Sequence, residues 1–457
     1  MEQELLLLKS VLVVFVKESC SVISGMTLYT QGYLRARFVD DEVIGPRWET
    51  HTETRLSLPR LQHEFFHNIE GLFSTGLVLE ALRNAPQLSA NLAVPLEESE
   101  WVVSLKSLRG AIWDAVLGPY LEQCWLQHGS VIFDEQILDQ VFQKTVAEIE
   151  APGVETEIIL CPVPRLKLVG GPVGFAPGLR IRPLEAEDVE IWLNPSWHWY
   201  GQPLGVGDYL HTQCAIEAIY HRPPQYYAVD TLLNRIQLDK EEADKISKVL
   251  GALRLLTDAP LNVAFTQKTQ RGLLRHRREI SYPQTPRPSQ FQRWVEVNQE
   301  AGVKLLNLWN RLQQGDVAED VELPFRRWYG ATDRLDDADR LIDYWVGLEA
   351  LFSPDSTQEV KFRSSLRIAA YLGETPDEWE TIYSEMRHSY DWRSTVVHGG
   401  SHREHKKLDK RGDLRTMTAK TRAYLRQAIL KLLTSDEPLS IKPGESEIKL
   451  LRRLGEK

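Results

Sequence analysis

The chain has 457 residues, with 42% hydrophobic and 26% charged positions and a formal net charge of −10. This length is too great for one ordinary domain and sufficient for two or three domains with their own cores. The composition is that of a soluble globular protein and excludes a disordered chain, and the acidic balance excludes a general polyanion binder, so any contact with nucleic acid must be confined to a patch.

The N-terminus is apolar at positions 5–8 and 11–16, but it does not have the pattern of a signal peptide. Glu2 and Glu4 replace the usual basic start, and Lys9 interrupts a stretch already too short to cross a membrane. We therefore expect a buried strand or helix here, in a cytoplasmic protein without membrane contact. The four cysteines are widely spaced and predict neither a disulfide framework nor a zinc site: Cys20, Cys124, Cys161 and Cys214.

Two regions precede the C-terminal part of the chain. Residues 1–150 are predicted to be mostly helical, with clear apolar faces at 78–82 and 111–117. Residues 151–285 form a β-rich region that ends in a Pro-rich linker. Its predicted elements are strands at 157–161, 166–169, 179–183, 189–193 and 214–220, a helix at 240–257 and the linker at 282–288. Neither region carries a P-loop, a Rossmann glycine pattern or a G-x-S-x-G motif, so a sensor or restraint with an unknown trigger or regulatory partner is the expectation by analogy.

One motif in the first region suggests a metal. His63 and His67 enclose Glu64 in the pattern H-E-x-x-H, in which the histidines bind zinc and the glutamate activates a metal-bound water. No third ligand has a recognisable signature, although Glu80 and residues 97–100 offer carboxylates. The alternative is a helix that buries its phenylalanines and leaves the histidines at a polar edge. A zinc metallopeptidase is therefore one alternative function, while the preferred hypothesis needs no cofactor.

Residues 289–440 are predicted to be entirely helical and are followed by a tail at 441–457. Leading helices are expected at 289–314 and 323–331. Four amphipathic segments with apolar residues at intervals of three and four follow, at 334–353, 358–373, 376–399 and 412–434. This spacing predicts a four-helix bundle. The predicted fold class is therefore α+β and multidomain, with an all-α bundle after a mixed helical and β-rich N-terminal region.

The third amphipathic segment has clear ends. Thr375 suits the N-cap, Pro376 the first helical position, and the Gly399-Gly400 pair the C-terminal end. His398 is thus expected in the last turn, five positions after Arg393, which corresponds to about 140° of rotation around the helix.

Arg393 and His398 together have the chemistry for phosphodiester transfer. Histidine gives and takes protons near neutral pH, and arginine is a permanent cation that matches phosphate oxygens. Phosphodiester transfer requires proton transfer and neutralisation of a charged transition state, and this pair supplies both. The alternative interpretation is a pair of side chains that bond to the terminal carbonyls of the helix.

The C-terminal segment resembles the HEPN domains, and within them the Apea-like branch. The resemblance rests on residues 339–352, 367–369 and 390–399. It implies a metal-independent endoribonuclease that acts as a homodimer, in which Arg393 stabilises the transition state and His398 is the general acid and base for attack by the ribose 2′-hydroxyl. The implied products have 2′,3′-cyclic phosphate and 5′-hydroxyl ends.

The same resemblance implies a supporting shell: Glu349, Arg367, Tyr390, Asp391 and Ser394. Glu349 and Arg367 are expected to form an ion pair between the first two helices of the bundle. Ser394 departs from the family, in which Asn, Asp or His commonly follows the arginine. A non-catalytic HEPN module for dimerisation or as an adaptor is therefore the second alternative. The expected role of the preferred ribonuclease is that of an effector of defence or stress response, such as an antiviral toxin.

A basic stretch follows His398 directly. Residues 402–431 contain ten Lys or Arg against three acids, a net charge of +7. Such a surface can hold a phosphate backbone, and the alternative is a solvated helix face. The predicted RNA-binding residues are Arg403, Lys406, Lys407, Lys410 and Arg411.

Overall fold

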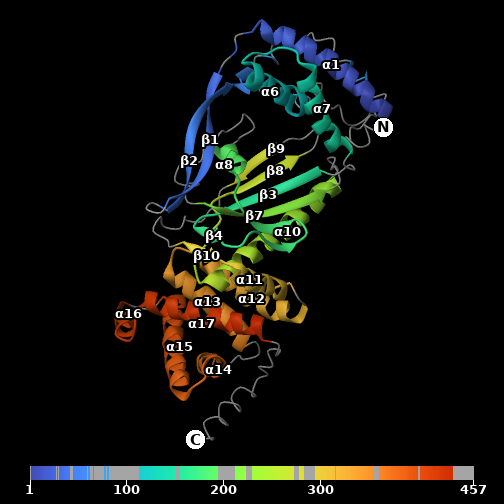
Figure 1. The fold of residues 1–457 in the computed structure, drawn as a ribbon. Coiled ribbons are helices and arrows are strands. Elements are labelled where there is room, and N and C mark those ends of the chain that lie inside the picture. The colour runs from blue at the N-terminus through green and yellow to red at the C-terminus, as the bar shows by residue number, and fades with distance from the viewer. Residues whose placement is uncertain are drawn as a thin grey trace. The chain divides into compact units, whose positions relative to one another are not determined.

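The computed structural model spans residues 1–457 and describes 2–26, 28, 30–41, 45–58, 60, 61, 65, 77, 78, 80, 81, 113–150, 155–193, 212–222, 229–271, 277–281, 294–313, 315–353, 360–399 and 402–435. These residues form a mixed α and β protein whose C-terminal part is helical (Figure 1). The chain divides into two compact units. The first contains Met1–Pro164, Ala176–Asp239 and Val263–Tyr282, and the second contains Arg165–Phe175, Lys240–Asn262 and Pro283–Lys457.

The helical part of the first unit is built around an apolar core. Its elements are α1 (Glu2–Ser24), η1 (Trp113–Leu117), α6 (Gly118–His128) and α7 (Glu135–Glu150). Val16 of α1, Leu121 of α6 and Leu138 of α7 are almost fully buried in this core. The apolar N-terminus is therefore a helix, and no helix of the described ranges combines the length and the apolar character of a membrane span.

A long hairpin follows α1 and was not predicted. Strands β1 (Thr30–Asp41) and β2 (Gly45–Leu56) pair antiparallel along their whole length, with Phe38 opposite Trp48. The sequence signal was the alternation of Leu34, Ala36 and Phe38 with polar residues, which is the period of a strand. The prediction that residues 1–150 are mostly helical is therefore wrong for this segment.

The strands of the β-rich region form an antiparallel sheet. Within the first unit its order is β6 (Leu179–Pro183), β7 (Cys214–Arg222), β3 (Glu155–Val163), β8 (Thr266–Arg271) and β9 (Arg277–Ser281). The predicted strands at 157–161, 179–183 and 214–220 are confirmed as parts of β3, β6 and β7. Strand β5 (Val173–Ala176) includes Phe175, the last residue of the segment Arg165–Phe175 of the second unit.

The predicted strand at 189–193 is instead a helix, α8 (Ala186–Leu193). Val189 and Trp192 are both buried, and their spacing of three residues places them on one helical face. Asp188 also accepts the backbone N–H of Glu185 over 2.9 Å at the start of the helix. The alternation of apolar and polar residues was misleading, because in a segment this short it fits one helical turn as well as a strand.

The second unit begins with short elements that precede the bundle. Strands β4 (Leu166–Leu168) and β10 (Val295–Val297) form a parallel pair, which confirms the strand predicted at 166–169. Three helices follow: the C-terminal part of α10 (Val229–Thr257), α11 (Gln299–Arg311) and α12 (Gly315–Ala331). The helix predicted at 289–314 is therefore shorter and follows a strand. The helix predicted at 323–331 begins earlier, because its buried face already includes Val321. The predicted linker at 282–288 lies outside the described residues.

Four helices of the second unit match the four predicted amphipathic segments. They are α13 (Asp337–Phe352), α14 (Val360–Leu372), α15 (Pro376–Val397) and α17 (Leu414–Thr434), and a short helix, α16 (His402–Asp409), joins the last two (Figure 1). The indole N–H of Trp345 on α13 donates to the Ser389 hydroxyl of α15 over 2.9 Å, and that hydroxyl lies 2.5 Å from Thr421 Oγ1 of α17. This buried polar chain fixes the three helices relative to one another.

Candidate functional site

The end of α15 is defined by local interactions. The side chains of Thr375 and Glu378 form a capping box at its N-terminus, as the sequence predicts for Thr375 and Pro376. At the other end the His398 N–H donates to the Ser394 carbonyl over 3.0 Å. Gly399 follows with φ of +67°, the left-handed conformation that glycine adopts without strain. His398 therefore occupies the C-cap of the helix.

Arg393 lies one turn before this end and faces α13. Its Nη2 atom is 3.5 Å from Glu349 Oε1, and the two side chains are 23% and 24% exposed. The guanidinium carbon also lies 5.4 Å from the centroid of the Tyr390 ring. The buried Nε atom has no hydrogen-bond partner among the described residues. Arginine has five N–H donors, and the contact with Glu349 is the one ion pair that Arg393 forms within the described residues.

Glu349 is thus engaged with the proposed catalytic cation. Burial raises the pKa of its carboxyl group above the ordinary value, and the positive charge of Arg393 opposes that rise. The sequence predicted a pair between Glu349 and Arg367. In the structure, Arg367 is almost fully buried and donates to the Phe352 carbonyl over 2.7 Å, at the end of α13. Arg367 therefore caps a carbonyl group at the C-terminal end of α13.

His398 differs from Arg393 in its surroundings. The residue is exposed, and its imidazole has no hydrogen bond or ion pair with the described part of the chain. An imidazole without such partners is available both to accept and to donate a proton. The chain therefore presents Arg393 toward α13 and His398 toward solvent, at the end of the same helix.

The remaining predicted supporting residues also lie on the last turns of α15. Asp391 forms an ion pair with Lys361 of α14. The Tyr390 ring packs edge-on against Trp345, with 5.0 Å between the ring centroids. Lys361 was missed in the sequence, because nothing local to it indicates that α14 and α15 place it beside Asp391. Ser394 is partly buried, and its carbonyl accepts the bond from His398.

The basic stretch separates into an exposed part and a structural part. Lys406, Lys407, Lys410 and Arg411 are exposed and form no ion pair within the described residues. The side chain of Arg403 lies outside them. Four other cations of the stretch hold the bundle, by bonds to Glu385, Asp258, the Leu255 carbonyl and the Tyr371 carbonyl: Lys420, Arg422, Arg426 and Lys431. These four side chains have partners within the second unit and are not among the predicted RNA-binding residues.

The short helix α16 that carries part of the exposed charge is attached to α15. The ring of His405 packs against Trp392, with 5.6 Å between the centroids. Trp392 in turn donates its indole N–H to the Gly412 carbonyl over 2.9 Å. The packing of His405 on Trp392 therefore holds α16 against α15, a few residues after His398.

The possible zinc ligands His63 and His67 lie outside the described residues. Among the residues that are described, no group of three or more His, Cys, Asp or Glu is arranged to hold a metal ion. The four cysteines are all buried free thiols.

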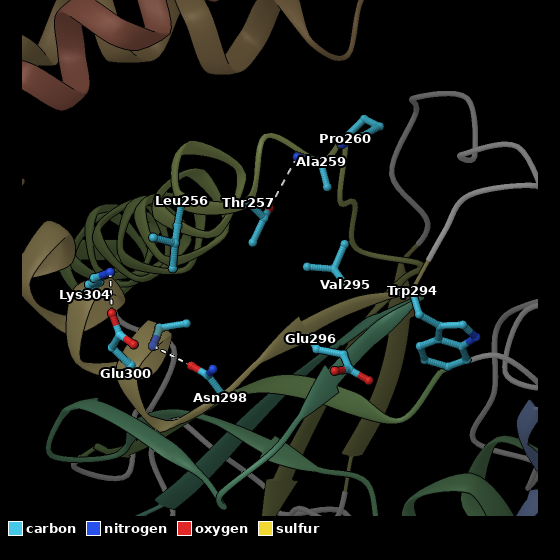
Figure 2. A pocket seen from close by; sticks show the side chains of 11 residues that line it. Leu256, Thr257, Ala259, Pro260, Trp294, Val295, Glu296, Asn298, Glu300 and Lys304 are labelled. Atoms are coloured by element: carbon cyan, nitrogen blue, oxygen red, sulfur yellow. Dashed lines mark hydrogen bonds and ion pairs between the residues drawn. The ribbon is translucent and has the colours of Figure 1, made fainter.

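The second unit also contains an open cavity of about 680 Å³, between the end of α10, β10 and the start of α11 (Figure 2). Leu256, Val295 and Ala301 give it apolar walls, and Glu300 and Lys304 form an ion pair of 2.6 Å at its rim. None of the predicted site residues lines this cavity, and its one lysine is already paired with a carboxylate.

Comparisons of the chain with protein-family models, with curated proteins and with solved structures give no match. The functional assignment therefore depends on the chemistry of the residues at the end of α15.

Proposed function

We propose that the helical C-terminal region is a metal-independent endoribonuclease that works as a homodimer, with Arg393 and His398 of both copies at the site. One observation carries the proposal: Arg393 and an exposed imidazole, that of His398, lie five residues apart at one helix end, and within the described residues the imidazole has no partner and the Arg393 Nε atom has no hydrogen bond. The resemblance of residues 339–352 and 390–399 to HEPN domains supports the same pair of residues.

In the proposed reaction, His398 of one copy takes the proton from a ribose 2′-hydroxyl, and the 2′-oxygen attacks the adjacent phosphorus. The P–O5′ bond breaks as the P–O2′ bond forms, and the histidine of the other copy gives its proton to the leaving 5′-oxygen. Arg393 neutralises the charge that develops on the phosphoryl oxygens. The products have 2′,3′-cyclic phosphate and 5′-hydroxyl ends.

The homodimer is part of the proposal because one chain presents its two groups in different directions. Arg393 faces Glu349 on α13, whereas His398 is exposed at the C-cap. A second copy in two-fold arrangement supplies the facing arginine and histidine, so that two imidazoles serve as base and acid. Two-fold dimers are the commonest assembly of identical chains.

The exposed lysines of α16 and the turn after it support RNA as the substrate. Lys406, Lys407 and Lys410 make no ion pair within the described residues, so their charges are available to phosphates. Arg403 and Arg411 belong to the same proposed surface. Binding through such cations releases counterions and weakens steeply as salt rises.

We further propose that the ribonuclease is an effector of defence or stress response, and that the N-terminal unit restrains it until a trigger or partner binds. A cytoplasmic location agrees with these roles. The acidic net charge of −10 supports a local RNA surface over general affinity for polyanions.

The test is cleavage of mixed RNA by the purified protein, with and without EDTA. Cleavage that persists in EDTA and is lost in both Arg393→Ala and His398→Ala supports the proposal. Matched controls are Arg387→Ala, an exposed arginine of the same helix, and His51→Ala, an exposed histidine of β2. RNA that stays intact under all conditions favours the non-catalytic dimerisation or adaptor module. Activity lost in EDTA and restored by zinc favours the metallo-site at His63 and His67.

A further inference from the structure

The contact between Glu349 and Arg393 has features that an ordinary surface ion pair lacks. The two groups are 3.5 Å apart and each is only about a quarter exposed, at 24% and 23%. Glu349 Oε1 and Arg393 Nε are both buried, and neither atom has a hydrogen bond within the described residues. Two opposite charges are thus largely removed from water and held together only loosely, an arrangement in which a change in one group is felt strongly by the other.

The helices packed around Glu349 direct their other charges elsewhere. On α14, Lys361 pairs with Asp391 of α15, and Arg367 donates to the Phe352 carbonyl. Lys420 of α17 pairs with Glu385 of α15. Arg327 of α12 pairs with Asp343 of α13. Burial and the charge of Arg393 act on the pKa of Glu349 in opposite directions, and burial dominates. The charge state of Glu349 therefore depends on whether the field of Arg393 is available to it.

A phosphate at Arg393 removes that field. Its negative charge offsets the guanidinium charge and also repels the Glu349 carboxylate, and both effects favour the protonated carboxyl. A protonated carboxyl no longer attracts the guanidinium, which leaves the donors of Arg393 to the phosphate oxygens.

We propose that a phosphodiester bound at Arg393 makes Glu349 take up a proton from solvent, so that anion binding at this site is coupled to proton binding. The inference rests on the proposed role of Arg393 as a phosphate-binding cation. Because coupling is reciprocal, protonation of Glu349 must also strengthen binding of the phosphodiester. Glu349 is then a positioning residue that releases Arg393 to the substrate, and the site binds phosphodiesters more tightly as pH falls toward the range in which the carboxyl titrates.

The test is calorimetric titration of a 2′-O-methyl RNA oligonucleotide into the full chain in two buffers of different ionisation enthalpy, at several pH values from about 5 to about 7, which lie above the ordinary pKa of a glutamate carboxyl. All variants are made in a His398→Ala background, which removes the uptake of protons by that imidazole. We expect the protein that carries only His398→Ala to take up protons when it binds the oligonucleotide. We expect a clear loss of that uptake when Glu349→Gln is added. The Glu349→Gln variant is expected to bind about threefold more tightly, because a neutral amide competes less for Arg393.

The matched control is Glu380→Gln, the same change at an exposed position of α15, which must keep the full uptake. Equal proton uptake with and without Glu349→Gln overturns the inference. The inference is also overturned if the protein does not bind the oligonucleotide, or if Arg393→Ala leaves that binding unchanged. If binding shows the Glu349-dependent proton uptake but the protein with its native His398 leaves RNA intact, this inference is supported and the proposed ribonuclease is contradicted. Cleavage of RNA without the Glu349-dependent uptake contradicts this inference alone.

Discussion

Gly347 of α13 lies against Leu425 of α17 so closely that a Cβ atom at residue 347 would come within 2.9 Å of Leu425 Cδ2. The same Cβ would lie 3.4 Å from the Cα atom of Pro324 in α12. A methyl group at residue 347 therefore requires the buried Leu425 side chain to shift within the packed core.

Gly347→Ala is therefore expected to destabilise the helical unit by about 1–3 kcal/mol, the usual cost of overpacking a core. Gly330→Ala is the matched control, because no atom lies within 4 Å of a Cβ added at that helical position. That control is expected to be neutral or to stabilise by about 0.5–1 kcal/mol, since alanine has the higher helix propensity. Chemical denaturation followed by circular dichroism measures both. Equal effects of the two substitutions would contradict the close approach of α13 and α17.

The capping box of α15 predicts a second measurable effect. Thr375→Ala removes the side-chain acceptor of the Glu378 N–H and is expected to cost about 1 kcal/mol. Ser384→Ala, at an exposed interior position of the same helix, is expected to change the free energy of unfolding by less than about 0.5 kcal/mol. A loss in the control as large as that in Thr375→Ala would show that the cap does not stabilise α15.

The same cap illustrates how much could be predicted from the sequence. Thr375, Pro376 and Gly399 define the ends of α15 by interactions within a few residues, and amphipathic spacing located α13, α14 and α17. The partner of Arg393 could not be predicted in this way, because it depends on which face of α13 meets α15. The sequence suggested Arg367 for Glu349, whereas the structure brings Arg393 to that carboxylate.

Alternation was a poorer guide than helix ends. Residues 189–193 alternate like a strand, yet Val189 and Trp192 are buried on one face of α8. The hairpin of β1 and β2 was missed because its alternation is mixed with many charged residues, such as Arg35, whose guanidinium binds the carboxylate of Glu190 on α8 over 2.8 Å. Contacts of this kind join segments far apart in the chain, and no local pattern encodes them.

Replacement of Arg393 is expected to make stability more dependent on pH. Because burial raises the pKa of Glu349, its carboxyl group holds a proton more tightly in the folded state than in the unfolded chain. The contribution of Glu349 to stability is therefore fully present below the unfolded pKa and is lost as pH rises through the folded pKa. Arg393→Met removes the charge that opposes this shift, so its destabilisation is expected to be larger at about pH 8 than at about pH 4.

Urea denaturation of wild type, Arg393→Met and Arg387→Met at both pH values measures this effect. The double variant Glu349→Gln/Arg393→Met is expected to lose the extra pH dependence, because it has no desolvated carboxylate. A pH dependence that persists in the double variant would assign the effect to another group.

The proposed RNA surface on α16 predicts how binding of RNA depends on salt. Lys406→Ala/Lys407→Ala removes two cations that form no ion pair within the described residues. The change is expected to lower the slope of log affinity against log salt by about 1.4, at about 0.7 for each lost contact with single-stranded RNA. Lys144→Ala/Lys240→Ala, at two exposed positions of other helices, serves as the control of equal charge and is expected to leave the slope unchanged. Equal slopes for the two double variants would contradict the proposal that α16 is part of an RNA surface.

The end groups of cleaved RNA test the central claim most directly. A defined oligoribonucleotide is incubated in EDTA with wild type or with His398→Ala, and the products are identified by mass spectrometry. The proposed mechanism predicts 2′,3′-cyclic phosphate and 5′-hydroxyl ends with wild type and intact oligonucleotide with the variant, at equal dimer content. Fragments with 5′-phosphate ends, or equal cleavage by His398→Ala, would contradict the proposed roles of Arg393 and His398.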